Sequence, residues 1–229
     1  MHIENDYLIL PNYFKRKKIT ATNFYGLIGG NKFKPKGDYL LSNLGLLKEE
    51  IDPFYTKRGE IAERICNEYL KQKGYITKTW NKNEINYDNF PKLKEVGGMI
   101  DIAITHPFRC VVECKSKNRC DIAKIKLFPN LEQENQALFY AFLSKCEKVK
   151  IIYVFFTDEQ EDNIRKNIRI NEDISNFCFY EKDLSYTNED ISNKIQQAID
   201  YKNKCIFERA IPLCDISDKA LKLLNLSRS

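Results

Sequence analysis

The chain has 229 residues, of which 43% are hydrophobic and 30% are charged. This apolar content excludes a natively disordered chain, because a single domain of this length has ample surface to bury. Lysine and arginine exceed aspartate and glutamate by a formal charge of +5, which permits an anionic partner without requiring one. We therefore expect a globular protein.

We expect neither a membrane span nor a secretory signal peptide. No apolar stretch is long enough to span a membrane, and the N-terminus lacks the pattern of a secretory signal peptide. The sequence thus predicts an intracellular protein with no membrane contact. The 8 cysteines are scattered along the chain, which favours reduced and mostly buried thiols over a disulfide framework.

The first fifty residues are predicted to contain a basic run and two helices. Residues 15–18 read Lys-Arg-Lys-Lys. Thr22 is expected to cap a short helix that the glycine pair at 29–30 ends. A second helix is expected over 37–47.

The rest of the chain alternates between helical and extended patterns. Helices are predicted from the spacing of apolar residues over 57–73, 132–144 and 191–201. Strands are predicted over 76–80, 100–105, 110–115, 149–156, 164–170 and 177–180. The second and third strands form an antiparallel hairpin, and the continuous apolar strand 149–156 is of the kind that lies centrally in a sheet. The predicted fold class is α/β, a mixed central sheet flanked by helices.

The predicted hairpin carries the residues that indicate chemistry. Because side chains alternate along a strand, Glu113 and Lys115 point to the same face. The hairpin brings the carboxylate of Asp101 beside Glu113. Two carboxylates at that distance repel each other unless a cation lies between them or one is protonated, and Mg²⁺ is the natural cation for oxygen ligands. The alternative is an ordinary ion pair between Glu113 and Lys115 on a solvated sheet face.

Two predicted helices supply further polar groups. Glu63 lies on the helix 57–73, four residues after Gly59. Gln136 and Tyr140 are four residues apart, so they share one face of the helix 132–144. Taken singly, Glu63 and Gln136 are equally well explained as solvated helix residues.

Other nucleic-acid and nucleotide chemistries lack their motifs. The chain has only 2 histidines, which excludes a histidine-rich zinc site and a nuclease built on paired histidines. No phosphate-binding loop of the ATPase type is present.

The order of these residues resembles the PD-(D/E)XK nuclease superfamily and, within it, the YqaJ-type viral recombinase nucleases, the family of phage lambda exonuclease. The matching pattern is G-x-x-x-E, then I-D, then V-E-C-K, then Q-x-x-x-Y. The segment Ile-Thr-Ala-Thr at 19–22 is similar to an I-T-A-S-like segment of that family, with its serine position on Thr22 and its arginine position on Lys15. The proline of the superfamily's name is absent, since Met99 and Ile100 precede Asp101.

The resemblance implies a restriction-endonuclease-like fold and a single nuclease domain over 1–229. Within it, residues 1–50 would form a helical part that binds a DNA end, and 57–205 the nuclease core. The implied activity is a Mg²⁺- or Mn²⁺-dependent deoxyribonuclease, foremost a 5′-to-3′ exonuclease on duplex DNA that acts in recombination. DNA is the implied partner, together with a single-strand annealing recombinase and a second copy of the chain, in the cytoplasm or another DNA-containing compartment.

Residue roles follow from the same resemblance. Asp101 and Glu113 would be metal ligands, the carbonyl of Cys114 a third, and Glu63 would hold metal-bound water. Lys115 would position the attacking hydroxide, while Gln136 and Tyr140 would brace the nucleophile and the sheet.

The basic run would bind the terminal phosphate of the DNA. The residues implied for this contact are Lys15, Arg16, Lys17, Lys18 and Thr22. Such a run is also typical of a solvated basic tail with only non-specific affinity.

Two alternatives stay open at this point. One is an endonuclease of the restriction type or of the CRISPR-associated and RecB-like type, and the other is a non-catalytic DNA-binding module. Some RecB-like relatives hold an iron–sulfur cluster through four cysteines. No close group of three C-terminal cysteines is present here, so no such cluster is expected.

Overall fold

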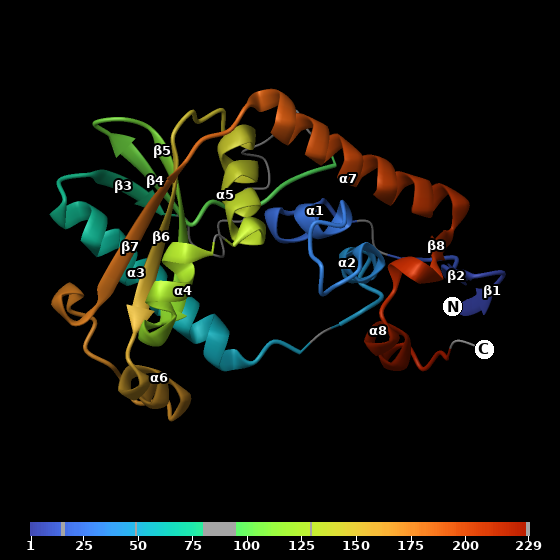
Figure 1. Cartoon of the computed structure of the whole chain (residues 1–229), viewed down its shortest axis with the longest axis horizontal. Coiled ribbons are helices and arrows are strands. Elements are labelled where there is room, and N and C mark those ends of the chain that lie inside the picture. The colour runs from blue at the N-terminus through green and yellow to red at the C-terminus, as the bar shows by residue number, and fades with distance from the viewer. Residues whose placement is uncertain (15–16, 49, 80–94, 129, 228–229) are drawn as a thin grey trace. The chain divides into compact units, whose positions relative to one another are not determined.

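The computed structural model describes residues 1–14, 17–48, 50–79, 95–128 and 130–227 (Figure 1). They form two compact units. The sheet unit comprises the described parts of 50–89 and 99–186, and the terminal unit those of 1–49, 90–98 and 187–229. The division predicted from the sequence, into an end-binding part over 1–50 and a core over 57–205, stays a prediction.

A mixed sheet of five strands organises the sheet unit, in the order β3-β4-β5-β6-β7 (Figure 1). The strands are β3 (Ile76–Thr79), β4 (Ile102–His106), β5 (Cys110–Asn118), β6 (Val149–Phe156) and β7 (Cys178–Leu184). Only β5 and β6 pair in parallel, while the other neighbours are antiparallel. This confirms the α/β class, the hairpin formed by β4 and β5, and the internal position of the apolar strand β6.

Four helices accompany this sheet among the described residues. They are α3 (Pro53–Gln72), α4 (Ile122–Leu127), α5 (Leu131–Leu143) and α6 (Asp158–Arg165), with short 3₁₀ turns η2 (Arg119–Asp121) and η3 (Ile174–Asn176). Helix α3 begins where the side chain of Asp52 accepts a hydrogen bond from the backbone of Phe54 at 2.9 Å, with Pro53 in the first turn. It ends before Gly74, whose φ of 86° is readily adopted only by glycine.

Helices α3 and α5 cover opposite faces of β5. The apolar stripe of α3 packs in one cluster with Val112 and Cys114 of β5 and with Ile152 of β6. On the other face, α5 contacts the side chain of Lys115. Since side chains alternate along β5, the same strand contributes core residues toward α3 and charged residues toward α5.

One predicted strand, 164–170, is wrong. Its first residues belong to α6, which Thr157 caps through a hydrogen bond from the backbone of Gln160 at 3.2 Å. Acidic residues in the first turn stabilise the helix, because their negative charge interacts favourably with the positive end of the helix dipole. These signals start a helix at Asp158 that continues to Arg165. The isoleucines that suggested a strand do not pair with the sheet.

The terminal unit contains a second, three-stranded sheet that the sequence analysis did not predict. Its strands are β1 (His2–Glu4), β2 (Tyr7–Ile9) and β8 (Ala210–Pro212), paired antiparallel in the order β1-β2-β8. Its helices are α1 (Ala21–Leu27), α2 (Lys36–Asn43), α7 (Asn188–Glu208) and α8 (Asp218–Leu223), with the 3₁₀ turn η4 (Leu213–Asp215). Among the described residues, none of the helices combines the length and the apolar character needed to cross a membrane.

The predicted cap of α1 is corrected by two residues. Thr20, and not Thr22, is the N-cap, because its carbonyl accepts from the backbone of Phe24 at 3.0 Å. Asn23 closes the cap, since its Oδ1 accepts from the backbone of Thr20 at 3.3 Å. Thr22 lies within the first turn and is exposed.

Candidate active site

The hairpin of β4 and β5 brings Asp101 to Glu113. Ile102 pairs with Val112, so the residue before β4 lies opposite Glu113. Oδ2 of Asp101 accepts a hydrogen bond from the backbone N–H of Cys114 at 3.0 Å, which fixes the carboxylate at this end of the hairpin. The structure therefore brings together the two carboxylates that the sequence paired.

Lys115 completes a compact set of charges on the α5 side of the sheet. Its Nζ lies 2.5 Å from Oε1 of Glu113 and donates to Oε1 of Gln136 at 3.0 Å. Glu113 is 1% exposed and the side chain of Lys115 is 18% exposed. The pair is thus not the solvated surface ion pair that the sequence left open. Helix α5 supplies Gln136 to hold the ammonium group in place.

The second oxygen of Glu113 has no hydrogen-bond partner among the described residues, although it is buried. A buried acceptor without a partner costs about 1–3 kcal/mol, and a charged one more. Burial, followed by the charge of Asp101, raises the pKa of the Glu113 carboxyl to about 8 against the opposing effect of Lys115. Burial also raises the pKa of Asp101. The site is therefore short of positive charge.

This electrostatic deficit fits a hard divalent cation. Within the described ranges, no three His, Cys, Asp or Glu side chains form a cluster that encloses an ion. Mg²⁺, however, is usually held by only one or two carboxylates and keeps several of its waters. Asp101 and Glu113 match that requirement, and the unpartnered Oε2 of Glu113 is the atom that such an ion would satisfy.

Glu63 approaches the pair from α3. Its side chain is half-buried. Its charge is among the causes that raise the pKa of Glu113, after burial and the larger effect of Asp101. The role predicted for Glu63, holding metal-bound water, stays a prediction.

Cys114 and Tyr140 are placed mainly by the core. The thiol of Cys114 points toward α3, where a hydrogen bond with Cys66 and burial raise its pKa. Its backbone alone reaches the site, through the bond to Asp101. Tyr140 is 6% exposed and packs edge-to-face on Phe139, with ring centroids 5.8 Å apart. The roles predicted for the Cys114 carbonyl and for Tyr140 stay predictions.

The sequence analysis missed two cations beside this site. Arg58 on α3 donates to Oγ of Ser116 at 3.2 Å and also pairs with Glu161, so it joins α3 and α6 to β5 directly after Lys115. Lys117 lies on the same strand face as Lys115, and burial lowers its pKa. The E-x-K-x-K alternation of 113–117 could have revealed Lys117. No local pattern marked Arg58.

The predicted DNA-binding residues belong to the terminal unit. Lys15 and Arg16 lie outside the described residues. Lys17 and Thr22 are exposed, and Lys18 is half-buried. Two buried side chains hold the backbone of this segment. Lys202 donates to the carbonyl of Lys17, and Nδ2 of Asn43 to that of Lys18 at 3.0 Å.

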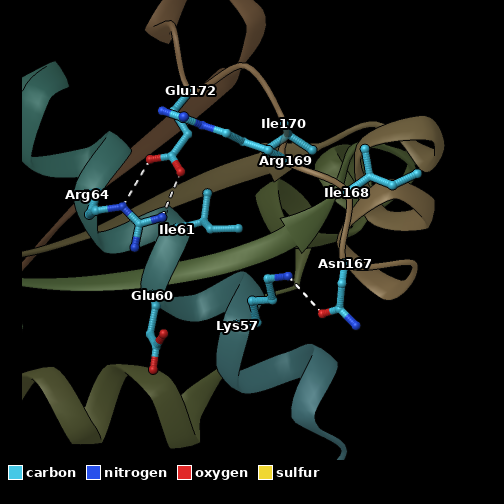
Figure 2. Close-up of a pocket in the computed structure, with 9 residues that line it drawn as sticks. All are labelled: Lys57, Glu60, Ile61, Arg64, Asn167, Ile168, Arg169, Ile170 and Glu172. Atoms are coloured by element: carbon cyan, nitrogen blue, oxygen red, sulfur yellow. Dashed lines mark hydrogen bonds and ion pairs between the residues drawn. The ribbon is translucent and has the colours of Figure 1, made fainter.

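A hollow of about 280 Å³ is lined by residues of α3 and of the segment 167–172 (Figure 2). Its charged side chains are largely matched within the hollow. Arg64 forms a two-point contact with Glu172, at 3.0 Å from Nε and 2.7 Å from Nη2, and Lys57 donates to Asn167 at 3.0 Å. Asp101, Glu113 and Lys115 are not part of its lining. The hollow therefore does not hold the candidate active site.

Comparisons with known proteins bear on the fold. No protein-family model matches the chain, and no curated protein is similar to it in sequence. Among solved structures, an alkaline exonuclease from Laribacter hongkongensis aligns over 84% of this chain and 89% of its own, with a TM-score of 0.57 and 14% identity. The same exonuclease in complex with dAMP aligns equally well.

A second exonuclease has a similar structure. A phage-related exonuclease from Haemophilus somnus 129PT aligns over 86% of this chain and 97% of its own, with a TM-score of 0.54 and 17% identity. At these identities the likeness concerns the fold. The chain has the fold of these exonucleases, which is the fold class that the sequence predicts.

Proposed function

We propose that the chain is a divalent-metal-dependent deoxyribonuclease, acting as a 5′-to-3′ exonuclease on duplex DNA. One observation carries the proposal. Glu113 is buried beside Asp101 with an unpartnered oxygen, while Lys115 is held at its other oxygen. A protein that only binds DNA has no use for a buried acidic pair, which repels phosphate. The exonuclease fold of the chain supports the same proposal.

The cation would be held by Asp101 and Glu113, with the carbonyl of Cys114 as a further ligand. Mg²⁺ or Mn²⁺ bound there supplies the positive charge that acidifies a water molecule and stabilises the charge of phosphoryl transfer. This charge also removes the repulsion between the two carboxylates.

The remaining side chains position the nucleophile and the phosphate. Lys115 donates from Nζ to the attacking oxygen and offsets negative charge that develops on the phosphate. Gln136 keeps the ammonium group aimed, because its Oε1 accepts from Nζ at 3.0 Å. Glu63 adds a third carboxylate, which accepts hydrogen bonds from ordered water.

The basic run is proposed to bind the 5′-terminal phosphate. That phosphate carries more negative charge than an internal diester and accepts hydrogen bonds from side chains. The proposed contacts are Lys17, Lys18 and Thr22, together with Lys15 and Arg16, which lie outside the described residues. Proposed partners beyond DNA are a single-strand annealing recombinase and a second copy of the chain.

A cleavage assay with defined ends tests the proposal. The substrates are linear duplexes with a 5′-phosphate or a 5′-hydroxyl and covalently closed circles, each in Mg²⁺, Ca²⁺ or EDTA. We expect fast digestion only of the phosphorylated linear duplex in Mg²⁺, and none by Glu113→Gln. The matched control is Glu181→Gln on the other face of the sheet, which should keep its activity. Cutting of closed circles would show an endonuclease instead of an exonuclease. Absence of cleavage under every condition would refute the proposal that the chain is a nuclease.

A further inference from the structure

Helix α4 and the residues after it present large apolar side chains to solvent. Leu127 is 71% exposed, Phe128 69% and Leu131 55%. No residue of α4 is buried. Exposed apolar side chains that follow one another so closely in the sequence suggest a binding surface more than a single exposed one does.

The same segment concentrates positive charge. Between residues 115 and 131 the sequence has five cations and a single carboxylate, that of Asp121, in a chain with a formal net charge of +5. The cations are Lys115, Lys117, Arg119, Lys124 and Lys126. Lys115 is paired with Glu113, whereas Lys124 and Lys126 of α4 are exposed beside Leu127 and Phe128 in the sequence. An exposed aromatic ring among cations suits an anionic ligand with flat bases.

We propose that Lys124, Lys126, Leu127, Phe128 and Leu131, here called the α4 surface, bind single-stranded DNA. A base would stack on the ring of Phe128 while the two lysines pair with phosphates on either side. Duplex DNA keeps its bases stacked internally, so the aromatic contact selects an unpaired strand. This inference rests on the proposed function. An exonuclease that digests one strand of a duplex leaves the other strand unpaired, and that unpaired strand is the proposed ligand.

The excess of cations decides between a nucleic acid and a protein as the ligand. A protein that covers Leu127 and Phe128 would also cover Lys124 and Lys126, which are exposed, and would have to supply acidic groups for them. A single DNA strand supplies both phosphates and apolar ring faces at regular intervals. The charge complementarity therefore favours the strand.

The test measures binding without cleavage. Fluorescence anisotropy in EDTA records the affinity of the full chain for an oligodeoxythymidine about twelve nucleotides long. Phe128→Ala should weaken binding about tenfold, and Phe128→Trp should retain it. The matched control is Phe207→Ala, since Phe207 on α7 is 90% exposed and lies outside the α4 surface. An abasic oligonucleotide of the same length should bind the intact chain weakly and lose nothing further in Phe128→Ala.

Three results would overturn the inference. Phe128→Ala could bind the oligonucleotide as tightly as the intact chain. It could lose affinity equally for the abasic strand, which would show that Phe128 does not bind by stacking on a base. It could instead lower the sedimentation coefficient of the protein alone, which would make the α4 surface a contact between copies. The binding assay does not measure cleavage, so the two proposals can fail separately. A chain that does not cleave DNA but binds the oligonucleotide through its bases refutes only the nuclease. A chain that cleaves DNA but shows no base-dependent binding refutes only this inference.

Discussion

Glu113 and Glu181 lie two strands apart in one sheet and both contact lysine, yet their surroundings shift their pKa values in opposite directions. Glu181 on β7 faces α3 and accepts from Tyr69 at 2.7 Å, from Lys73 and from Lys150. Burial raises its pKa, but these three donors outweigh burial and lower the pKa to about 2. For Glu113, burial and Asp101 dominate and raise the pKa to about 8.

The difference shows how a structural ion network can be told from a candidate metal site. Both oxygens of Glu181 have cationic partners, so the network is complete as it stands. Glu113 has a cation on Oε1 only, while Oε2 is buried without a partner among the described residues. The carboxylate of Glu181 is neutralised by the chain itself, whereas the unpartnered oxygen of Glu113 is where we propose that a cation binds.

The largest expected effect is on catalysis at Glu113. Glu113→Gln should reduce the rate of cleavage by about a thousandfold or more, because an amide cannot neutralise a divalent cation. The free energy of unfolding should change by only about 1 kcal/mol, since the lost charge is one that burial disfavours. Single-turnover cleavage and urea unfolding measure the two quantities. Near-normal cleavage would place the metal elsewhere.

Lys115 should affect turnover more than affinity. A group that acts on the nucleophile contributes mainly in the transition state, so Lys115→Ala should slow single-turnover cleavage in Mg²⁺ by about a hundredfold. Its affinity for DNA, measured in Ca²⁺, should fall far less. Equal losses in rate and affinity would make Lys115 a phosphate contact rather than a catalytic residue.

Glu181 should show the converse behaviour. Glu181→Gln weakens the contacts to Lys73 and Lys150, so it should lower the free energy of unfolding. The loss should be only about 1–2 kcal/mol, because the side chain of Glu181 is 19% exposed and solvent partly screens its ion pairs. Cleavage by the folded variant should stay at the level of the intact enzyme. A strong loss of cleavage would end the distinction between the two glutamates.

The smallest expected effect is the pH dependence of the stability that Glu181 contributes to the folded chain. The pKa of Glu181 is about 2 in the folded chain against an ordinary value of 4.5, so folding favours its ionised form. Its stabilisation is therefore complete above about pH 4.5 and is lost as the pH falls toward 2. The intact chain and Glu181→Gln should converge in unfolding free energy over that window. A constant difference down to about pH 2 would contradict the cause given for the shift.

The sequence predicted the parts of the fold that carry local signals. Strand β6 is a continuous apolar run and α3 has periodic apolar residues followed by Gly74, so both were found within a few residues. The sheet of the terminal unit was not found, because Leu8 pairs with Ile211 across almost the whole chain. That pairing leaves no trace in a local window, whereas the hairpin of β1 and β2, which turns at Asn5 and Asp6, is local and was overlooked.

The candidate site was predictable for a similar reason. Glu113 and Lys115 share a strand, and a short hairpin joins them to Asp101, so alternation alone placed their side chains. The burial that distinguishes this site from a surface ion pair depends on α5 and could not be seen in the sequence. Arg58 was missed because its contact with Ser116 joins two elements that are distant in sequence.

The central claim is that Asp101 and Glu113 bind a divalent cation, and calorimetric titration of the full chain with Mn²⁺ in the absence of DNA tests it most directly. The account predicts a saturable heat of binding that Glu113→Gln abolishes and Glu181→Gln preserves. It is contradicted if the intact chain shows no saturable binding, or if Glu113→Gln binds Mn²⁺ with unchanged affinity.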